Sequence, residues 1–369
     1  MKFKVNSIQL QKKLDNLIKV SRNSKVVPIL KYFKVDLADD VCKITASDME
    51  VTLVANLMPE EVLEVGSTCV SADKFTEIVK KLGDVTLTIS TQANNLIIKC
   101  KYGTYKIPTS NSEDFPLTPQ LSQEDLITIP AYSIVSALNK TLFAAGDDEH
   151  RPTLKGVYFG FKYDKTSFVA TDTRRISVVN GAPLVATEKS VIVPTKVCQS
   201  LLSVLAGKEE DVDVLIGERS VLVKSHEYDV YGKLIDGEYV NYNMVLNQSV
   251  DCIVTVKTKE LIAAVDRAMI FSANGYNIVQ IQVLVGQLKV SGEDIDFSLS
   301  AEEEVECINK EGSGAFLVNG RQMIEILQRV STEEAEISFN SEKTSPTVYV
   351  NPTNTEDDYL FGVTKIAYL

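Results

Sequence analysis

The chain has 369 residues, of which 44% are hydrophobic and 24% are charged, and its formal net charge at pH 7 is −12. This composition excludes a disordered chain and supplies enough apolar residues for several compact cores. No apolar run approaches the roughly 18 residues that a membrane-spanning helix needs, and the start of the chain lacks the apolar stretch of a signal peptide. We therefore expect a cytoplasmic protein with no membrane partner.

The predicted elements are amphipathic helices separated by short strands of alternating polarity. The first third has a helix through Leu10, Leu14 and Ile18, a strand at 42–46, a helix at 70–82 and strands at 85–90 and 95–107. After the polar stretch 109–125 come a helix through Ile134, Leu138 and Leu142, a strand at 190–194, a helix at 193–205 and strands at 212–217 and 220–235. After 241–251 come a helix through Leu261, Val265 and Met269, a strand at 287–292, a helix at 318–330 and a strand at 347–350.

These helices repeat at about one third of the chain length. The segments 70–82, 193–205 and 318–330 align without a gap at offsets of 123 and 125, and the other helix of each third repeats at offsets of 124 and 127. The period is too long for a solenoid unit and matches an ordinary domain. We predict three similar α+β domains with antiparallel sheets, at 1–124, 125–250 and 251–369.

Residues that carry catalytic or metal chemistry are scattered. The six cysteines form no CxxC pair, so we interpret them as reduced, buried thiols and expect no metal and no cofactor. They are Cys42, Cys69, Cys100, Cys198, Cys252 and Cys307. The two histidines, His150 and His226, lie in no ligand pattern, and the GKEED at 207–211 lacks the features of a phosphate-binding loop. A binding or scaffold protein, rather than an enzyme, is the default prediction.

The charge is distributed unevenly along the acidic chain. Residues 1–31 contain eight lysines and arginines against Asp15 alone. Further cations lie on the repeated helices, at Lys80, Lys81, Lys140, Lys196, Lys257, Lys259, Arg267, Arg321 and Arg329. One interpretation is that these are ordinary solvated helix faces, and the other is a positive surface on an acidic body, where lysines meet phosphates.

A set of short segments carries a family resemblance. The segments are VPIL at 27–30, ASDMEV at 46–51, VSADKF at 70–75, DFP at 114–116, VATDTRRISV at 169–178, VIVPTK at 191–196 and KLIDGEYVNY at 233–242. With the threefold repeat they resemble the bacterial sliding clamps, the β subunits of DNA polymerase III, from Met1 to Leu369. The combination is specific, although no single segment would be.

The resemblance implies a homodimer closed head to tail into a ring, with helices lining the hole and antiparallel sheets outside. Such a ring encircles double-stranded DNA without reading its sequence and tethers polymerase to it, which makes the polymerase processive in DNA replication. The partners implied are the DNA polymerase III α subunit, the clamp loader δ subunit and other proteins with a clamp-binding motif. The clamp itself catalyses nothing.

The resemblance also implies three surfaces. The dimer contact falls on Tyr105, Ile107, Ile270 and Phe271. The DNA-facing residues are Lys12, Lys13, Lys19, Arg22, Lys25, Lys80, Lys81, Lys140, Arg151, Lys196, Lys259 and Arg321. The peptide-binding pocket is formed by Leu154, Thr171, Thr173, Arg174, Arg175, Ile176, Val240, Val245, Asn319, Ser345, Thr347, Val363, Lys365, Ile366, Ala367, Tyr368 and Leu369.

This chain departs from the family pattern inside that pocket. Thr173 and Arg174 replace a common Gly-His pair, Val240 replaces a proline, and the chain ends in KIAYL. An apolar hole edged by polar groups suits a short peptide with Leu and Phe anchors.

Two alternatives to a clamp remain at this point. One is a hydrolase or transferase that uses Asp48, Asp172 and Arg175, although ion pairing or turn capping also explains Asp172. The other is a scaffold that binds proteins without forming a ring or holding DNA.

Overall fold

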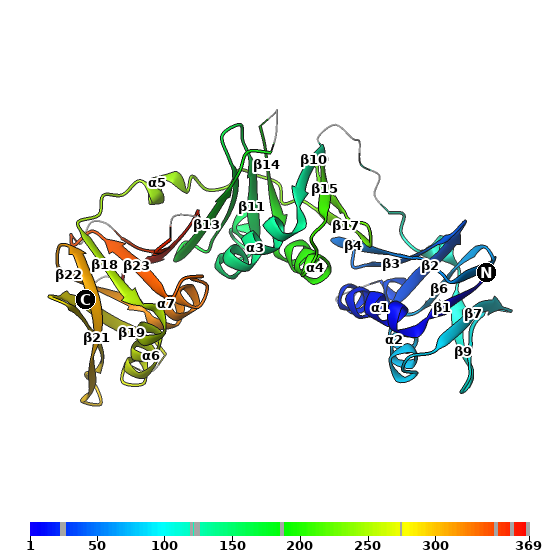
Figure 1. Cartoon of the computed structure of the whole chain (residues 1–369), viewed down its shortest axis with the longest axis horizontal. Coiled ribbons are helices and arrows are strands. Elements are labelled where there is room, and N and C mark those ends of the chain that lie inside the picture. The colour runs from blue at the N-terminus through cyan, green and yellow to red at the C-terminus, as the bar shows by residue number, and fades with distance from the viewer. Residues whose placement is uncertain are drawn as a thin grey trace. The chain divides into compact units, whose positions relative to one another are not determined.

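The computed structural model describes residues 1–22, 27–118, 121, 126–184, 188–273, 275–342, 346–354 and 358–366. The chain divides into two compact units. The first unit is Met1–Val135 with Val193–Ile235, and the second is Ser136–Ile192 with Asp236–Leu369. Each unit is built on one long antiparallel sheet with helices packed on it (Figure 1).

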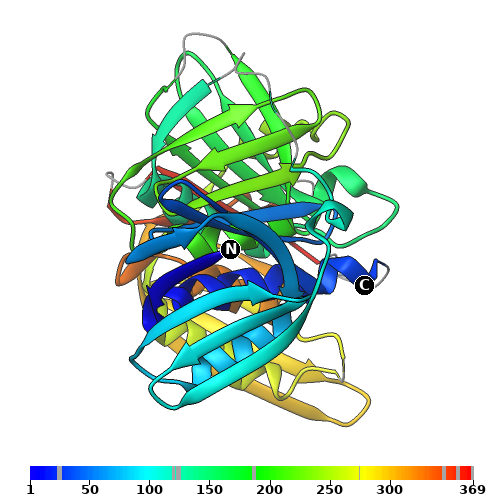
Figure 2. The same cartoon turned by 90° about the vertical axis from the view of Figure 1, so that its right-hand side faces the viewer.

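The sheet of the first unit has the strand order β10-β15-β16-β17-β4-β3-β2-β6-β9-β8-β7-β1-β5, and Figure 2 shows it as a curved layer. Its strands are β1 (Lys2–Asn6), β2 (Tyr32–Ala38), β3 (Val41–Ser47), β4 (Val51–Leu57), β5 (Glu61–Glu64), β6 (Gly66–Ser71), β7 (Thr86–Gln92), β8 (Asn95–Cys100), β9 (Gly103–Ser110), β10 (Leu126–Pro130), β15 (Asp211–Ile216), β16 (Ser220–Lys224) and β17 (Tyr228–Lys233). Its helices are α1 (Ser7–Ser21), α2 (Ala72–Lys81) and α4 (Thr195–Leu205). Helix α3 (Ala131–Thr141) and strand β14 (Lys189–Pro194) contain the points where the chain passes between the units.

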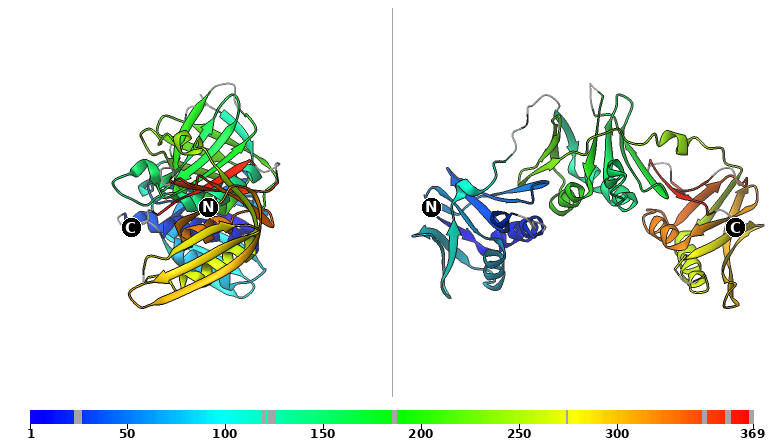
Figure 3. Two further views of the ribbon diagram at one scale, coloured as in Figure 1. Left: turned by 90° about the vertical axis from the view of Figure 1, so that its left-hand side faces the viewer. Right: turned by 180° about the vertical axis from the view of Figure 1, so that it is seen from behind.

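The sheet of the second unit has the order β14-β11-β12-β13-β25-β24-β23-β18-β21-β20-β19-β22, and its yellow and orange strands face the viewer in the left panel of Figure 3. Its further strands are β11 (Gly156–Phe161), β12 (Thr166–Thr171), β13 (Arg175–Gly181), β18 (Cys252–Lys257), β19 (Ile278–Leu284), β20 (Gln287–Asp294), β21 (Leu299–Glu311), β22 (Gly314–Asn319), β23 (Glu334–Phe339), β24 (Thr347–Pro352) and β25 (Tyr359–Thr364). Its helices are α5 (Asn243–Leu246), α6 (Thr258–Met269) and α7 (Gly320–Leu327).

Helix α1 illustrates how the sequence builds the helical layer. The Asn6 side chain caps its start, because Asn6 Oδ1 accepts hydrogen bonds from the N–H groups of Ile8 at 2.8 Å and Gln9 at 3.3 Å. Leu10 and Leu14, four residues apart on one face, are fully buried. Helices α1 and α2 lie side by side in the first unit, as α6 and α7 do in the second (Figure 1).

All six predicted repeat helices are present, which confirms the 3.6-residue patterns. The bounds differ at the starts of α2, α4 and α7, because residues 70–71 end β6, residues 193–194 end β14 and residues 318–319 end β22. Two segments expected as continuous strands are hairpins instead: 95–107 forms β8 and β9, and 220–235 forms β16 and β17. The polar residues Lys101 and Ser225 begin the turns that break these segments.

The cysteines behave as packing residues. All six are free, and Cys42, Cys69, Cys198 and Cys252 are buried, whereas Cys100 and Cys307 are half buried. Burial raises the pKa of the Cys42 thiol to about 12, so this thiol stays neutral and is a poor nucleophile. No helix among the described residues is long and apolar enough to cross a membrane.

In each unit, two strands from different thirds of the chain pair and make the sheet continuous. Strand β17 of the central third pairs with β4 of the first third, with Val230 opposite Leu53. Strand β13 of the central third pairs with β25 of the last third, with Ser177 opposite Phe361. We call these pairings the β4–β17 junction and the β13–β25 junction.

Candidate functional site

The second unit holds a cavity of about 310 Å³ at the β13–β25 junction, which we call the Ile176 pocket. It is formed by the turn before β13, the segment 240–248, and the ends of β24 and β25. The lining includes many residues of the predicted pocket: Thr171, Thr173, Arg174, Arg175, Ile176, Val240, Val245, Thr347 and Val363. The remaining lining residues are Asn241, Tyr242, Gln248, Pro346, Gly362 and Thr364.

The floor of the Ile176 pocket is apolar. Ile176 and Val363 are buried, and Val245 is half buried. Gly362 keeps the hole open, because a Cβ atom at this position would lie 2.7 Å from Cγ2 of Ile176 and 3.1 Å from Cγ2 of Thr347. A hole of this composition accommodates aliphatic or aromatic side chains.

The turn that forms one wall is fixed by Asp172. Its Oδ1 accepts hydrogen bonds from the backbone N–H groups of Arg174 at 2.8 Å and Arg175 at 2.7 Å. The hydroxyl of Thr171 donates to the carbonyl oxygen of Arg175 at 2.6 Å. Thr173 between them has φ of 75°, the left-handed conformation that a glycine would adopt without strain. The turn therefore presents the side chains at positions 173 and 174 in a defined place.

Arg175 links this turn to helix α7. Its guanidinium donates to Asp172 Oδ2 from Nε at 3.0 Å and from Nη2 at 2.9 Å, and its Nη1 contacts Glu325 on α7. The Arg175 and Asp172 side chains are each less than a fifth exposed. This pair is partly buried and joins two N–H groups to one carboxylate oxygen, and it is structural because both charges are already compensated. This is the turn-capping and ion-pairing interpretation of Asp172, and it leaves this carboxylate no free role in acid–base chemistry.

Asp48 occupies the same kind of turn at the β4–β17 junction. Its Oδ1 accepts from the N–H groups of Glu50 at 3.0 Å and Val51 at 2.8 Å. Lys196 on α4 lies with Nζ 3.7 Å from Asp48 Oδ2 and also contacts Glu50. Both aspartates of the enzyme hypothesis thus cap turns, and the described residues contain no cluster of His, Cys, Asp or Glu that could hold a metal ion.

Tyrosines that no sequence pattern predicted hold the segment 239–246 against the sheet. The Tyr239 hydroxyl accepts a hydrogen bond from the N–H of Thr171 at 3.1 Å, and its ring centroid lies 5.4 Å from that of Tyr158. Burial raises the pKa of Tyr239 above its usual range, so the hydroxyl stays protonated. The hydroxyl of Tyr349 donates to the carbonyl oxygen of Val245. These contacts position Val240 and Val245 over the pocket.

Other predicted pocket residues have different surroundings. Leu154 is buried, and Asn319 caps the start of α7, where its Oδ1 accepts from the N–H of Gln322 at 3.2 Å. Lys365 Nζ contacts the carbonyl oxygen of Asn340, and the N–H of Ile366 donates to that of Leu317 at 2.8 Å. None of these four is among the lining residues of the Ile176 pocket. Ser345, Ala367, Tyr368 and Leu369 lie outside the described residues.

The predicted DNA-facing cations differ in how free they are. Lys12, Lys80, Lys81, Arg151, Lys259 and Arg321 are exposed. Others are engaged: Lys19 Nζ donates to Ser203 at 2.8 Å, Arg22 pairs with Asp73 at 3.0 Å, and Lys140 Nζ lies 4.8 Å from the Tyr359 ring centroid. Lys25 lies outside the described residues.

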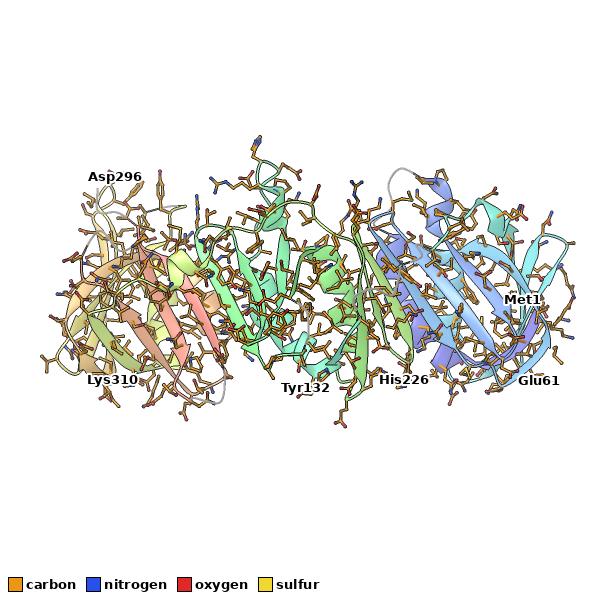
Figure 4. The ribbon with its side chains drawn as sticks, turned by 90° about the horizontal axis from the view of Figure 1, so that it is seen from above. Met1, Glu61, Tyr132, His226, Asp296 and Lys310 are labelled. Atoms are coloured by element: carbon orange, nitrogen blue, oxygen red, sulfur yellow. The ribbon has the colours of Figure 1, made fainter. Side chains whose placement is uncertain are left out.

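Lys13 is the least accessible of these cations. Only 7% of the residue is exposed, its Nζ lies 3.3 Å from Glu227, and the same atom lies 4.4 Å from the centroid of the Tyr228 ring. Burial lowers the pKa of Lys13 despite the neighbouring carboxylate. Its contacts give it a packing role in the first unit. It borders a cavity of about 710 Å³ that Lys12, Lys43 and His226 also line. His226, between β16 and β17, is labelled in Figure 4.

Strands β9 and β21, which lie inside the sheet orders, each leave part of one edge unpaired among the described residues, in addition to the terminal strands β10, β5, β14 and β22. Residues 103–108 of β9 pair only with β8, and residues 299–306 of β21 pair only with β20. In Figure 4, Asp296 before β21 and Lys310 near its end lie toward opposite edges of the second unit. The exposed residues on the β9 segment include Lys106, and those on the β21 segment include the acidic Glu302, Glu304 and Glu306 besides Leu299 and Ser300.

The predicted dimer residues lie close to these edges. Tyr105 and Ile107 belong to β9, where Tyr105 is half buried and Ile107 is 7% exposed. Ile270, directly after α6, is 74% exposed, and Phe271 is half buried. Ile270 is therefore an uncovered apolar side chain in this unit.

Comparison with known proteins identifies the family of this fold. Models of the N-terminal, central and C-terminal domains of the DNA polymerase III beta subunit match residues 1–119, 128–241 and 243–361. The chain belongs to the DNA polymerase III β-subunit family. The β sliding clamp of Bacillus subtilis is 28% identical over 289 residues, 76% of each chain, and that of Staphylococcus aureus is 24% identical over 351 residues, 92% of this chain and 93% of the relative.

Solved structures agree with the β-subunit fold. The DNA polymerase III β subunit of Pseudomonas aeruginosa superposes with a TM-score of 0.93 at 23% identity, and the β subunit from the DNA polymerase of Streptococcus pyogenes with a TM-score of 0.94 at 19% identity, each covering 100% of both chains. Three tandem α+β clamp domains with antiparallel sheets are thus confirmed. The β-subunit family consists of non-catalytic processivity factors of DNA replication, so the expectation that the chain is not an enzyme is also confirmed.

Proposed function

We propose that two copies of this chain close head to tail into a ring that encircles double-stranded DNA and tethers the DNA polymerase III α subunit to it in the cytoplasm. The clamp loader δ subunit and other proteins with a clamp-binding motif bind the same ring. We also propose the domain limits 1–124, 125–250 and 251–369. Family membership supports the general function, and the open strand edges carry the assembly proposed here.

The open edges of β9 and β21 are complementary. An unpaired strand edge is a template for another strand, and soluble proteins normally protect it. Lys101 and Lys106 flank the edge of β9, whereas Glu304 and Glu306 lie on β21. Because the two edges differ, each copy offers one of each kind, and contacts between unlike faces close into a ring when the rotation allows. Ile270 and Phe271 would add the apolar part of that contact.

The assembly is testable by charge insertion at the apolar contact. Ile270→Asp and Phe271→Asp would each bury an unpaired carboxylate in the interface, which costs several kcal/mol. We expect folded monomers by light scattering, whereas Tyr163→Asp, at a residue that is 62% exposed in the turn before β12, should leave the dimer intact. A dimer of unchanged mass for both interface variants would refute the proposed contact.

The DNA would be held by topology. Lysines and arginines spread over helices in all three domains can meet phosphates, and no base-reading motif accompanies them. Binding to short linear duplex should therefore be weak and strongly dependent on salt. Lys12→Gln with Lys19→Gln should weaken it further, whereas Lys31→Gln with Lys224→Gln removes equal charge elsewhere in the first unit and should change it little.

Loading on circular DNA separates encirclement from surface binding. After a clamp loader has placed the protein on nicked circles, it should remain through a high-salt wash and leave when the circle is cut. Retention that is equal before and after linearisation would overturn the ring and favour ordinary surface binding.

The Ile176 pocket is the proposed site for partner peptides. Its floor of Ile176, Val245 and Val363 suits Leu and Phe anchors, as the predicted clamp-binding motif requires. Leu154, Asn319, Ser345 and residues 365–369 remain part of the proposal as flanking contacts. Fluorescence polarisation with a labelled Leu- and Phe-bearing peptide tests it, and deletion of Tyr368 and Leu369 should weaken binding if the end of the chain contributes.

A further inference from the structure

We infer that Arg174 makes the Ile176 pocket select partner segments that carry a carboxylate beside their apolar anchors. The inference rests on the proposed function, because it assumes that a peptide occupies this pocket. It adds a charge requirement, which the apolar floor alone does not impose.

The first step is the charge of the pocket wall. The described lining residues include two charged side chains, Arg174 and Arg175, and no aspartate or glutamate. Arg175 is already compensated by Asp172 and Glu325. The Arg174 side chain is exposed, and its guanidinium has no hydrogen bond or ion pair to any described residue. One uncompensated cation thus stands at the rim of an apolar hole.

The second step is that this cation is presented from a fixed place. The Arg174 N–H donates to Asp172 at 2.8 Å, and its carbonyl oxygen accepts from the N–H of Thr364 on β25 at 2.8 Å. The backbone of residue 174 is therefore fastened on both sides, to its own turn and to the neighbouring strand. The fixed backbone holds the Arg174 side chain next to the pocket, so the guanidinium can reach a peptide there without a movement of the turn.

The third step is the chemistry that such a group recognises. A guanidinium presents a planar set of N–H donors that matches the two oxygens of a carboxylate. In an extended peptide, residues two apart lie on the same side at about 7 Å spacing, which an arginine side chain spans. A carboxylate two positions from a Leu anchor in the hole can therefore reach Arg174.

The fourth step compares the local charge of Arg174 with the net negative charge of the whole chain. The protein carries a formal net charge of −12, so its long-range field disfavours acidic segments. A local cation at the pocket reverses this preference for the few residues next to the anchors. Arg174 would then contribute specificity more than affinity, since a pair at an exposed rim is worth little by itself.

The test uses two labelled peptides that differ only by Asp or Asn two positions from the Leu anchor, measured by fluorescence polarisation. Wild-type protein should bind the Asp peptide about 5-fold more tightly at low salt. The ratio should fall to about 1 in Arg174→Gln and remain in Arg219→Gln, which removes the same charge from an exposed turn of the first unit. Added salt should reduce the wild-type ratio.

Charge reversal provides the second measurement. In Arg174→Glu, a peptide with Lys at the tested position should bind better than the Asp peptide. Equal binding of Asp and Asn peptides by wild-type protein would overturn the selectivity while leaving the peptide pocket intact. Failure of both peptides to bind would instead overturn the proposed peptide site itself. Thermal unfolding of each variant distinguishes lost recognition from lost folding.

Discussion

The β4–β17 and β13–β25 junctions share the same strand pairing and turn but differ in the cavity beside them. At each junction, an aspartate caps the turn before one of the paired strands, Asp48 before β4 and Asp172 before β13. An ion pair then joins the junction to a helix. The charges are reversed: in the first unit Lys196 on α4 faces Asp48 and Glu50, whereas in the second Glu325 on α7 faces Arg175. The first junction has a cavity of about 120 Å³ lined mainly by polar side chains, and the second has the larger Ile176 pocket.

The difference lies in what packs beside the strands. At the β13–β25 junction, the segment 239–246 is held by Tyr158, Tyr239 and Tyr349, and it supplies Val240 and Val245 to the pocket. At the β4–β17 junction, Asn16, Lys19 and Ser203 from α1 and α4 close the smaller cavity with hydrogen bonds. The larger cavity of the second junction therefore depends on the added segment, while the strand pairing is common to both junctions.

The largest effect should come from removing the guanidinium that the second junction depends on. Arg175→Met leaves the carboxylate of Asp172, 17% exposed, and that of Glu325 without their partner. We expect a loss of about 3 kcal/mol from the stability of the second unit, because breaking a partly buried pair strands a charge. Hydrogen exchange of β13 and β25 in urea would measure it, with β3 and β6 of the first unit as the internal control. Unchanged protection of β13 would contradict the role of this pair.

A pair of glycine substitutions separates packing from binding. In Gly232→Ala, on β17, the new Cβ would lie 2.5 Å from Cγ2 of Val197 on α4, so overpacking should cost the first unit about 1–3 kcal/mol. Peptide binding should not change. In Gly362→Ala, on β25, the Cβ instead enters the pocket floor near Ile176, and peptide affinity should fall roughly tenfold. Urea unfolding and polarisation titrations of both variants would test this. Weaker peptide binding in Gly232→Ala, or unchanged binding in Gly362→Ala, would contradict the prediction.

The sequence was most informative where the signal is local. The helices α1, α2, α4 and α7 follow from apolar spacing within a dozen residues, and their threefold recurrence predicts the domains. The pairings of β17 with β4 and of β13 with β25 join strands far apart in the chain, for which periodicity carries no information. Tyr239 contacts Thr171 across 68 positions, so its role was not predictable from its neighbours.

The burial of Lys13 could have been predicted from its position on the helix. It lies three residues after Leu10 and four before Leu17, on the stripe that α1 buries against its sheet. The family resemblance placed it among the DNA-facing residues, whereas its position on the helix predicts burial. Its ion pair with Glu227 and its contact with the Tyr228 ring make that burial possible.

A smaller effect should follow from loosening the segment that distinguishes the second junction. Tyr239→Phe removes the hydroxyl that accepts the Thr171 N–H at 3.1 Å and keeps the ring contact with Tyr158. We expect a loss of about 1 kcal/mol in stability and a few-fold weaker peptide binding, because the turn and the segment lose their direct link. Tyr163→Phe, at an exposed tyrosine in the second unit, is the control for loss of a hydroxyl. Equal behaviour of the two variants would mean that the hydroxyl does not position the pocket.

The smallest effect should come from the ion pair of the first junction. The Lys196 side chain is 46% exposed, so solvent screens its pairs with Asp48 and Glu50, and Lys196→Ala should cost only about 0.2–1 kcal/mol. The hydrogen bond to Glu50 is the main cause that raises the pKa of Lys196. A raised lysine pKa means that this contribution is complete below the unfolded-state value of about 10.4 and is lost as pH rises through the folded-state value. Thermal unfolding of wild type and Lys196→Ala should therefore differ slightly at neutral pH and converge at strongly alkaline pH, whereas Lys224→Ala should follow wild type throughout; a difference that grows with pH would reject the pairing as its cause.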